Sequence, residues 1–235
     1  EMDPDTHNID VSDLRLKISD KTKVIHITYL SGMVPDLGEI TAIAKEKHLT
    51  IIEDITQNYG AKYEGKLVGT FGDIAVGSFS LGKCIASLTG GFVITNNENF
   101  YEKIKSYCDS ELKEPKRKFL FKLAYGQLLV SITTSKYIFN WITHTIFLLL
   151  SWLSPKKMEE IHQPKYYYKN IHKQSFYENP PLLRDRWPDD IFSHFSDFQA
   201  HLALVTLRKI EHGVRKRQGL AKTLLANLSK DVKNR

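Results

Sequence analysis

Four polar side chains that could do chemistry together lie at the ends of two predicted strands. Asp54 follows a short apolar run at residues 50–52, and Gln57 comes three residues later. Ser78 and Lys83 close the next predicted strand. Because ligands of open α/β sheets bind outside the carboxyl ends of the strands, we expect a carboxylate, an amide, a hydroxyl and an amine to converge on one edge of a sheet.

The lysine of this group is the residue with the most specific chemistry. Lys83 lies among small residues and shortly before the pair Gly90-Gly91. A neutral amine in such a loop can form a Schiff base with an aldehyde. A carboxylate such as Asp54, paired with a pyridinium nitrogen, makes a bound pyridoxal ring a strong electron sink. Taken singly, each residue has a simpler explanation, namely a solvated loop lysine and an aspartate that caps a helix.

Hydrophobic patterning predicts the elements that position these residues. Strands are predicted at residues 22–30, 50–52, 73–80 and 90–96, and helices at residues 35–48 and 97–107. The first strand, the first helix and the second strand make a βαβ unit within about 30 residues, which requires a parallel pairing. The sequence therefore predicts an α/β fold with a mainly parallel sheet flanked by helices.

Composition excludes several classes of protein. The 235 residues are 42% hydrophobic and 26% charged, as in a globular protein rather than a disordered or fibrous one. A net charge of +6 is a modest excess and predicts no nucleic-acid binding. Cys84 and Cys108 form no C-x-x-C pair, which favours the reducing cytoplasm, and the nine histidines have no metal-binding spacing. The chain begins at Glu1 rather than at Met and stops within a basic segment, so we expect a fragment lacking both ends.

A hydrophobic segment at residues 119–153 has only two charged residues, Lys122 and Lys136, and is flanked by basic clusters. Two short helices in a hairpin, broken near residues 133–135, fit it better than one spanning helix. Its tryptophans and flanking lysines suit peripheral contact with the inner face of a membrane. A pair of buried core helices, or a hydrophobic dimer contact, is the alternative.

The chain thus divides into three predicted segments. They are the central part of an α/β domain at 1–108, a hydrophobic helical insert and loop at 109–190, and a returning helix at 191–235. Residues 155–190 predict a loop, and a long amphipathic helix is predicted from Ser196.

Several motifs in one order resemble the DegT/DnrJ/StrS family of sugar aminotransferases. They are E-D-x-x-Q-x-x-G-A at residues 53–61, G-x-x-G-D at 69–73, S-F-x-x-x-K at 78–83 and a G-G pair at 90–91. The segment SDFQAHLALVTLRKIE is similar to the family's return helix. The resemblance implies part of the large domain of a fold-type-I transferase that uses pyridoxal 5'-phosphate.

The resemblance also implies a role for each of the four polar residues. Lys83 would hold the cofactor through a Schiff base and then move the proton between cofactor and sugar carbons. Asp54 would pair with the pyridine nitrogen, and Gln57 would lie against the ring near its hydroxyl. Ser78 would contact the cofactor phosphate. A lysine at position 83, where related dehydratases have histidine, favours amino transfer over dehydration.

The activity implied by the resemblance is transfer of an amino group, with glutamate as the expected donor, to a nucleotide- or lipid-linked keto-sugar for cell-surface polysaccharide. The expected enzyme is a homodimer, and the given chain is expected to be inactive alone. The family's G-x-N-x-R positions read Asp190, Phe192 and His194, which implies an altered phosphate clamp. That departure motivates the alternative of a catalytically silent, membrane-associated scaffold or dimer partner of the same fold.

Overall fold

The computed structural model describes residues 2–3, 7–80, 82–153 and 192–228. It contains two compact units, residues 1–115 with 192–235 and residues 116–191. The loop predicted at 155–190 lies outside the described residues. The three-segment division made from the sequence stays a prediction.

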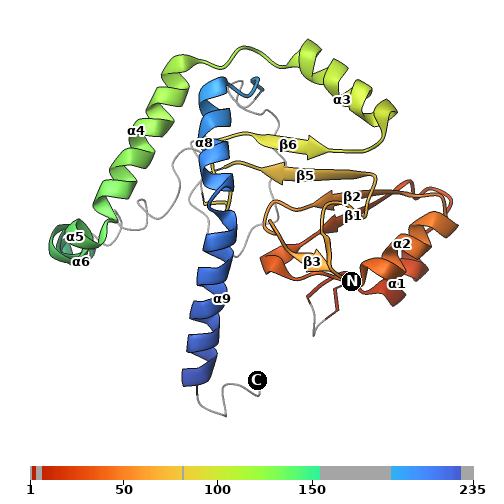
Figure 1. Cartoon of the computed structure of the whole chain (residues 1–235), viewed down its shortest axis with the longest axis horizontal. Helices are drawn as coiled ribbons and strands as arrows, with labels where there is room; N and C mark the ends of the chain where they lie inside the picture. Colours follow the sequence, from red (N-terminus) through yellow and green to blue (C-terminus); the bar gives the residue numbers. More distant parts are fainter. Residues whose placement is uncertain (1, 4–6, 81, 154–191, 229–235) are drawn as a thin grey trace. The chain divides into compact units, whose positions relative to one another are not determined.

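A four-stranded sheet forms the centre of the first unit (Figure 1). Its strands are β1 (Val24–Thr28), β2 (Thr50–Asp54), β5 (Ile74–Ser78) and β6 (Gly91–Ile94), in the order β1-β2-β5-β6. The first three run parallel, and β6 is antiparallel to β5. The predicted α/β class with a mainly parallel sheet is therefore confirmed.

Helix α2 (Leu37–Glu46) is the crossover between β1 and β2, and it covers one face of the sheet. Asp36 begins it by accepting a hydrogen bond from the Glu39 amide. Every side chain that α2 buries is apolar: Leu37, Ile40, Ile43 and Ala44. Leu37, Ile40 and Ala44 share one core with the alternate buried residues of β1 and β2, such as Ile27 and Ile51. Each such buried isoleucine or leucine contributes about 1.5–3 kcal/mol to folding.

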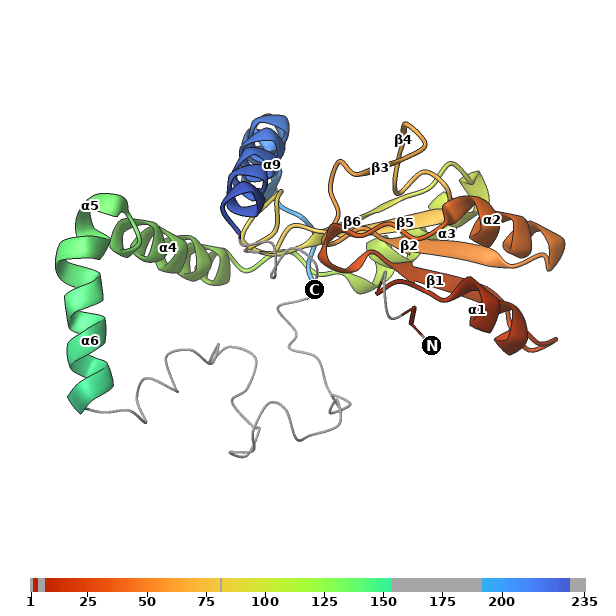
Figure 2. The ribbon, with the colours of Figure 1, turned by 90° about the horizontal axis from the view of Figure 1, so that it is seen from below.

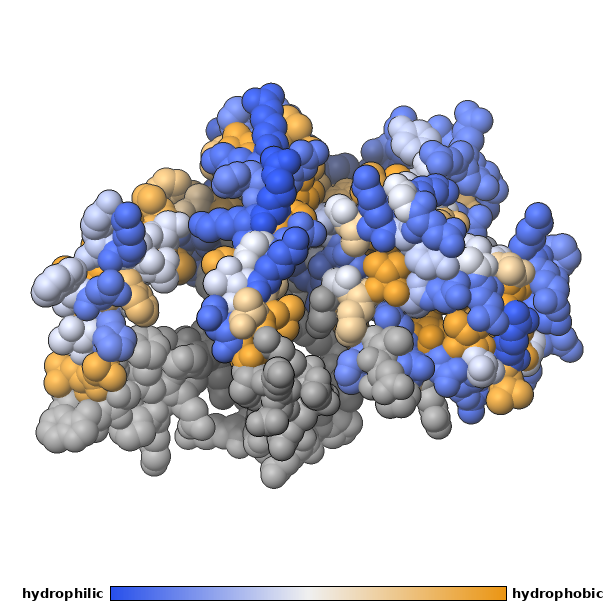
Figure 3. Space-filling view, turned by 60° about the horizontal axis from the view of Figure 1, so that its bottom comes forward, coloured by the Kyte–Doolittle hydropathy of each residue, from blue (hydrophilic) through white to orange (hydrophobic). Residues whose placement is uncertain are grey.

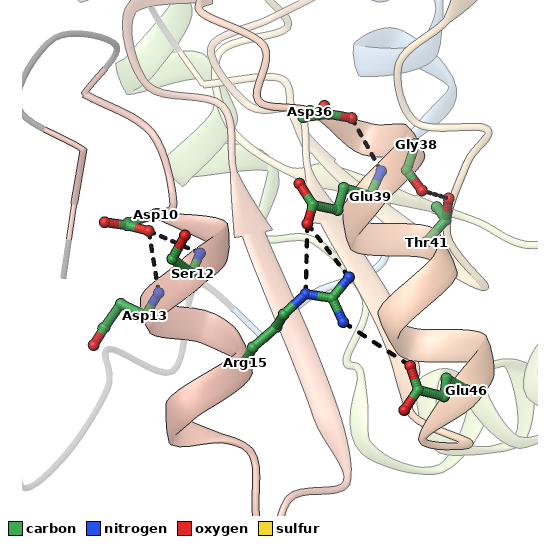
Figure 4. Close-up of polar contacts among 9 residues, drawn as sticks. All are labelled: Asp10, Ser12, Asp13, Arg15, Asp36, Gly38, Glu39, Thr41 and Glu46. Carbon is green, nitrogen blue, oxygen red and sulfur yellow. Dashed lines mark hydrogen bonds and ion pairs between the residues drawn. The ribbon is translucent and has the colours of Figure 1, made fainter.

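Helix α1 (Val11–Lys17) is tied to α2 through polar side chains at its surface. Figure 4 shows Arg15 reaching Glu39 and Glu46, with N–O distances of 3.3 and 3.9 Å. All three side chains are about half exposed, so these ion pairs contribute less than about 1 kcal/mol each. The capping bonds of Asp10 to the Ser12 and Asp13 amides begin α1 itself.

The first unit is completed by the short hairpin β3 (Lys62–Tyr63) and β4 (Lys66–Leu67), by the 3-10 turn η1 (Leu30–Gly32), and by three more helices. These helices are α3 (Glu98–Glu111), α8 (Asp197–Leu207) and α9 (Ile210–Asn227). Figure 3 shows polar and apolar side chains interspersed on the visible face of the α/β unit.

The single long helix predicted from Ser196 is wrong, because the chain turns between α8 and α9. The Lys209 amide donates to the Thr206 carbonyl, three residues back, instead of continuing the four-residue ladder. The Thr206 hydroxyl bonds backward to Ala203 and also accepts from the Ala86 amide. The end of α8 is thus held by a contact distant in sequence, which the helical pattern does not contain.

The second unit consists of α4 (Arg117–Thr133), α5 (Lys136–Ile138), the π-helical η2 (Phe139–Thr143) and α6 (His144–Leu153). The predicted break near residues 133–135 is confirmed, but the expected hairpin is wrong. Figures 1 and 2 show α6 leaving α4 at a steep angle. The Thr143 hydroxyl donates to the Thr133 carbonyl at 2.7 Å and joins the two sides of this bend. None of the helices in the described ranges combines the length and apolar composition needed to cross a bilayer.

Candidate functional site

The carboxyl ends of β2 and β5 bring Asp54 and Ser78 to one edge and one face of the sheet. In the parallel register Asp54 pairs with Val76, and Ser78 follows two residues later. Side chains alternate between the faces of a strand, so Asp54, Val76 and Ser78 share a face. The opposite face of β2 carries the buried Ile51 and Glu53 of the core.

The chain leaves β2 through a turn that the Asp54 side chain itself forms. Its Oδ1 atom accepts a hydrogen bond from the Thr56 amide at 2.9 Å. The amide of the intervening residue, Ile55, donates to the Val76 carbonyl of β5 at 2.9 Å. Asp54 is half-buried at this turn, and Gln57 is exposed just beyond it.

Lys83 lies in a loop that closes tightly on the end of β5. The Phe79 amide donates to Gly90 at 2.8 Å, and the Ser87 amide donates to Phe79 at 2.7 Å. Within the loop, the Lys83 amide donates to the Ser80 carbonyl at 3.2 Å. Lys83 is half-buried, and in the described part of the chain no ion pair joins its amine to Asp54.

The Ser78 hydroxyl belongs to a pair of hydroxyls at the start of that loop. Ser78 Oγ lies 2.5 Å from Ser80 Oγ, and it also accepts from the Ser80 amide at 3.2 Å. Sequence reasoning named Ser78 alone. The second hydroxyl was visible as a serine two residues later in the S-F-x-x-x-K motif, but nothing in a local pattern says that the two side chains meet.

Tyr59 is the residue of this edge that sequence reasoning missed. Its hydroxyl accepts from the Ser78 amide at 2.6 Å and donates to the Ser78 carbonyl at 2.5 Å. Strand geometry explains this double contact, because the backbone groups of successive residues point to opposite neighbouring strands. The Phe79 amide bonds Gly90, next to β6, and the Val76 carbonyl bonds Ile55, next to β2, so the backbone of Ser78 also points toward the β2 side. Because β2 ends at Asp54, the tyrosine hydroxyl takes the place of the missing strand.

The environment of this hydroxyl connects three parts of the site. Burial raises the pKa of Tyr59 above its ordinary value, the Ser78 bond opposes that shift, and electrostatic interaction with Cys84 and Asp54 adds to it. Tyr59 therefore lies within electrostatic reach of the end of β2 and of the residue beside Lys83. The Tyr59 ring lies beside the ring of Phe92 on β6, with the two centroids 6.1 Å apart.

Glu53, directly before Asp54, anchors the glycine-rich loop that follows the hairpin. The carboxylate is 0% exposed and accepts four hydrogen bonds. Its donors are the Tyr29 hydroxyl and the amides of Gly69, Phe71 and Gly72, at 2.5–2.7 Å. Burial and this carboxylate raise the pKa of Tyr29. The motif residue Glu53 thus holds the loop and β2 together and does not face the polar edge.

The G-x-x-G-D motif is structural for a similar reason. A Cβ atom on Gly72 would lie 2.8 Å from the Ile51 carbonyl oxygen, so only glycine allows this close approach. The following Asp73 accepts from the Ile51 amide at 2.8 Å through its side chain. Both residues hold the start of β5 against β2 and so fix the position of Ser78, at the end of β5, relative to Asp54.

The N-terminus of α8 holds the loop that follows Lys83. Ser196 and Gln199 form a capping box, and the buried Gln199 side chain donates to the Thr89 carbonyl at 3.1 Å. The Ser87 hydroxyl in turn donates to the Gln199 carbonyl at 2.5 Å. The segment that resembles the family's return helix is therefore bonded to the lysine loop.

Two of the three residues that replace G-x-N-x-R lie just before α8, and Asp190 lies outside the described residues. The backbones of Phe192 and His194 bond Lys113: its amide donates to Phe192, and the His194 amide donates to its carbonyl. Phe192 is exposed. No group of three or more histidine, cysteine, aspartate or glutamate side chains suited to a metal ion occurs among the described residues.

Known proteins with similar sequences match just under half of the chain. The chain is 43% identical to GDP-perosamine synthase of Escherichia coli O157:H7 over 101 residues. This match covers 43% of this chain and 28% of that protein. Over 109 residues it is 37% identical to lipopolysaccharide biosynthesis protein RfbH of Salmonella typhimurium, 46% of this chain and 25% of that protein. The chain thus spans about a quarter of the length of these relatives.

A solved structure shares the fold. The aminotransferase from Psychrobacter cryohalolentis superimposes with a TM-score of 0.59 at 24% identity, over 96% of this chain and 43% of that one. Residues 1–129 match the sequence profile of a family, and this match includes Asp54, Gln57, Ser78 and Lys83. Since it covers more than half of the 235 residues, the chain belongs to the DegT/DnrJ/EryC1/StrS aminotransferase family.

Proposed function

We propose that this protein is a pyridoxal-phosphate-dependent aminotransferase that transfers an amino group, from glutamate, to a nucleotide-linked keto-sugar in cell-surface polysaccharide biosynthesis. One observation carries the proposal: a carboxylate and a hydroxyl end two paired parallel strands, and a lysine follows in the adjoining loop. The relatives named GDP-perosamine synthase and lipopolysaccharide biosynthesis protein RfbH support the sugar substrate.

The donor set fits pyridoxal 5'-phosphate. When bound, this group supplies an electron sink for the carbon that loses or gains a proton. The Asp54 carboxylate, on the face it shares with Ser78, would keep a proton on the pyridine nitrogen. The exposed Gln57 would lie against the ring, and the Ser78–Ser80 hydroxyl pair would donate to the phosphate.

Lys83 would act as the catalytic residue of the site. Lys83 is half-buried as a residue, and its loop is bonded to the start of β6 and to α8, which fixes the backbone from which the side chain extends. Lys83 would hold the cofactor through its amine and would then move a proton between cofactor and substrate carbons. Asp54 and Lys83 lie in different turns, and no ion pair within the described ranges joins the Asp54 carboxylate to the Lys83 amine.

The proposal extends to assembly and location. We propose a homodimer in the cytoplasm, with peripheral contact of residues 119–153 at the inner face of the membrane. Such contact would place the enzyme near glycosyltransferases or a lipid-linked sugar. The exposed apolar side chains of α4 and α6 support a contact surface in this segment.

Borohydride trapping tests the cofactor and its site together. The whole protein, incubated with pyridoxal phosphate and reduced, is expected to carry one pyridoxyl group on the peptide that contains Lys83. Lys83→Ala should lose the adduct and turnover, whereas the matched control Lys62→Ala, in the exposed hairpin, should keep both. A folded protein with no adduct at saturating cofactor would contradict the proposal and favour the silent scaffold.

A further inference from the structure

The helices at residues 117–153 expose many large apolar side chains. On α4, five of the six exposed ones recur at helical spacing, namely Phe121, Tyr125, Leu128, Leu129 and Ile132, while Val130 lies off their face. Residues spaced by three, four, seven and eleven positions share one face of a helix. This face is more than an isolated exposed residue and requires a partner.

The segment after the bend continues the apolar surface with aromatic and branched side chains. Its exposed members are Tyr137, Phe139, Trp141, Ile142, Ile146, Leu148 and Leu149. Trp141 is 82% exposed and Tyr137 is 74% exposed. Tryptophan and tyrosine are the residues that accumulate where acyl chains meet lipid headgroups.

Charge indicates what this surface contacts. Residues 116–153 contain no aspartate or glutamate and five cations: Lys116, Arg117, Lys118, Lys122 and Lys136. Three of them lie at the cap and first turn of α4, which has no acidic residue. Because the N-terminus of a helix already carries a partial positive charge, these cations add to it and are stabilised by an anionic partner.

A second copy of this chain is a poor occupant for the same surface. Most homodimers are isologous, with the same patch on both subunits. Two copies meeting through parallel α4 helices would bring arginine and lysine against arginine and lysine, and antiparallel helices would leave the same cations with no carboxylate of the segment opposite them. An anionic lipid surface meets both requirements, since it offers phosphates to the cations and acyl chains to the apolar face.

We propose that α4 and the segment from α5 to α6 dock this protein on membranes rich in anionic phospholipid. The exposed face of α4 enters the boundary between headgroups and acyl chains, and Arg117, Lys118 and Lys122 bind the headgroup phosphates. This inference deepens the peripheral contact of the proposed function and rests on that part of it alone.

Vesicle flotation tests the charge requirement. The protein is expected to float with vesicles of equal parts phosphatidylcholine and phosphatidylglycerol, and far less with phosphatidylcholine alone. Replacing the three cations, by Arg117→Gln, Lys118→Gln and Lys122→Gln, should weaken binding on the order of 100-fold. The matched control removes as much charge from α9, by Lys216→Gln, Arg217→Gln and Lys222→Gln, and should bind like the unaltered protein.

A second pair of variants tests the apolar face. Phe121→Ser with Trp141→Ser changes side chains that are 73% and 82% exposed, so the fold is preserved. Binding should fall by at least about 10-fold. Leu16→Ser on α1, where the side chain is 83% exposed, is the matched control and should have no effect.

Several outcomes would overturn the inference. They are no flotation with the anionic vesicles, equal binding to both vesicle types, and loss of binding in a control equal to that in its matched variant. If the protein does not bind vesicles but forms a dimer that Phe121→Ser with Trp141→Ser dissociates, the surface belongs to a contact with a second copy. The assay contains no cofactor, and Lys83→Ala should float normally, so failure here and failure of amino transfer are distinguishable.

Discussion

Replacing Glu53 by glutamine should destabilise the first unit far more than its small change in size suggests. The carboxylate oxygens each accept two hydrogen bonds: Oε2 from the Tyr29 hydroxyl and the Gly69 amide, Oε1 from the Phe71 and Gly72 amides. In glutamine one oxygen becomes an NH₂ group that faces two donors, whichever way the amide turns. Two bonds to a charged acceptor are then lost at about 1.5–3 kcal/mol each, or about 3–6 kcal/mol in total.

Denaturant unfolding followed by circular dichroism measures this loss directly. Glu39→Gln is the matched control, because it removes a half-exposed carboxylate that pairs with Arg15 on the surface and should cost less than about 1 kcal/mol. Tyr29→Phe removes one of the four donors and should fall between the two variants. A loss below about 1 kcal/mol for Glu53→Gln, or a loss equal to that of the control, would refute the reasoning.

Three further predictions concern residues around the paired strands β2 and β5. Tyr59→Phe leaves the Ser78 amide and carbonyl without their partner, so unfolding should become about 1–3 kcal/mol easier and hydrogen exchange at the Ser78 amide faster; unchanged exchange there would contradict the assigned contact. Gly72→Ala forces a Cβ atom against the Ile51 carbonyl, and denaturation should show a loss of about 1–3 kcal/mol; an unchanged midpoint would show that the strands can separate at no cost. Asp54→Asn should keep the borohydride-trapped cofactor but lower turnover by on the order of 100-fold or more, because a neutral amide does not favour a protonated pyridine; undiminished turnover would remove Asp54 from the mechanism.

Local patterning was enough for the elements and for part of the site. Short β-branched and apolar runs located the four strands of the central sheet, and helical spacing located α2, because burial leaves such patterns in the chain. The rule that parallel strands end at the same edge then brought Asp54 and Ser78 together before any coordinates were known. The polar stretch at residues 133–135 marked the break after α4 for a similarly local reason: its hydroxyls bond the preceding turn.

Contacts between distant residues were beyond such reasoning. Tyr59 lies between the motif residues Gln57 and Gly60, and no local pattern predicts its contact with Ser78. Gln199 bonds Thr89, which is 110 positions away in the sequence. The bend between α4 and α6 depends on a hydroxyl ten residues from its acceptor, so the expected hairpin was wrong. The end of α8 likewise depends on Ala86, on a different part of the fold.

Glu53 and Asp54 show the division most clearly. Adjacent carboxylates in one strand look alike in sequence, yet strand alternation sends them to opposite faces. One becomes a buried acceptor for the Gly69–Gly72 loop, and the other lies at the polar edge with Ser78. Periodicity follows from the chain alone because it reflects each residue's own burial, whereas the partner of a buried polar group is set by whichever distant segment the folded chain packs against it.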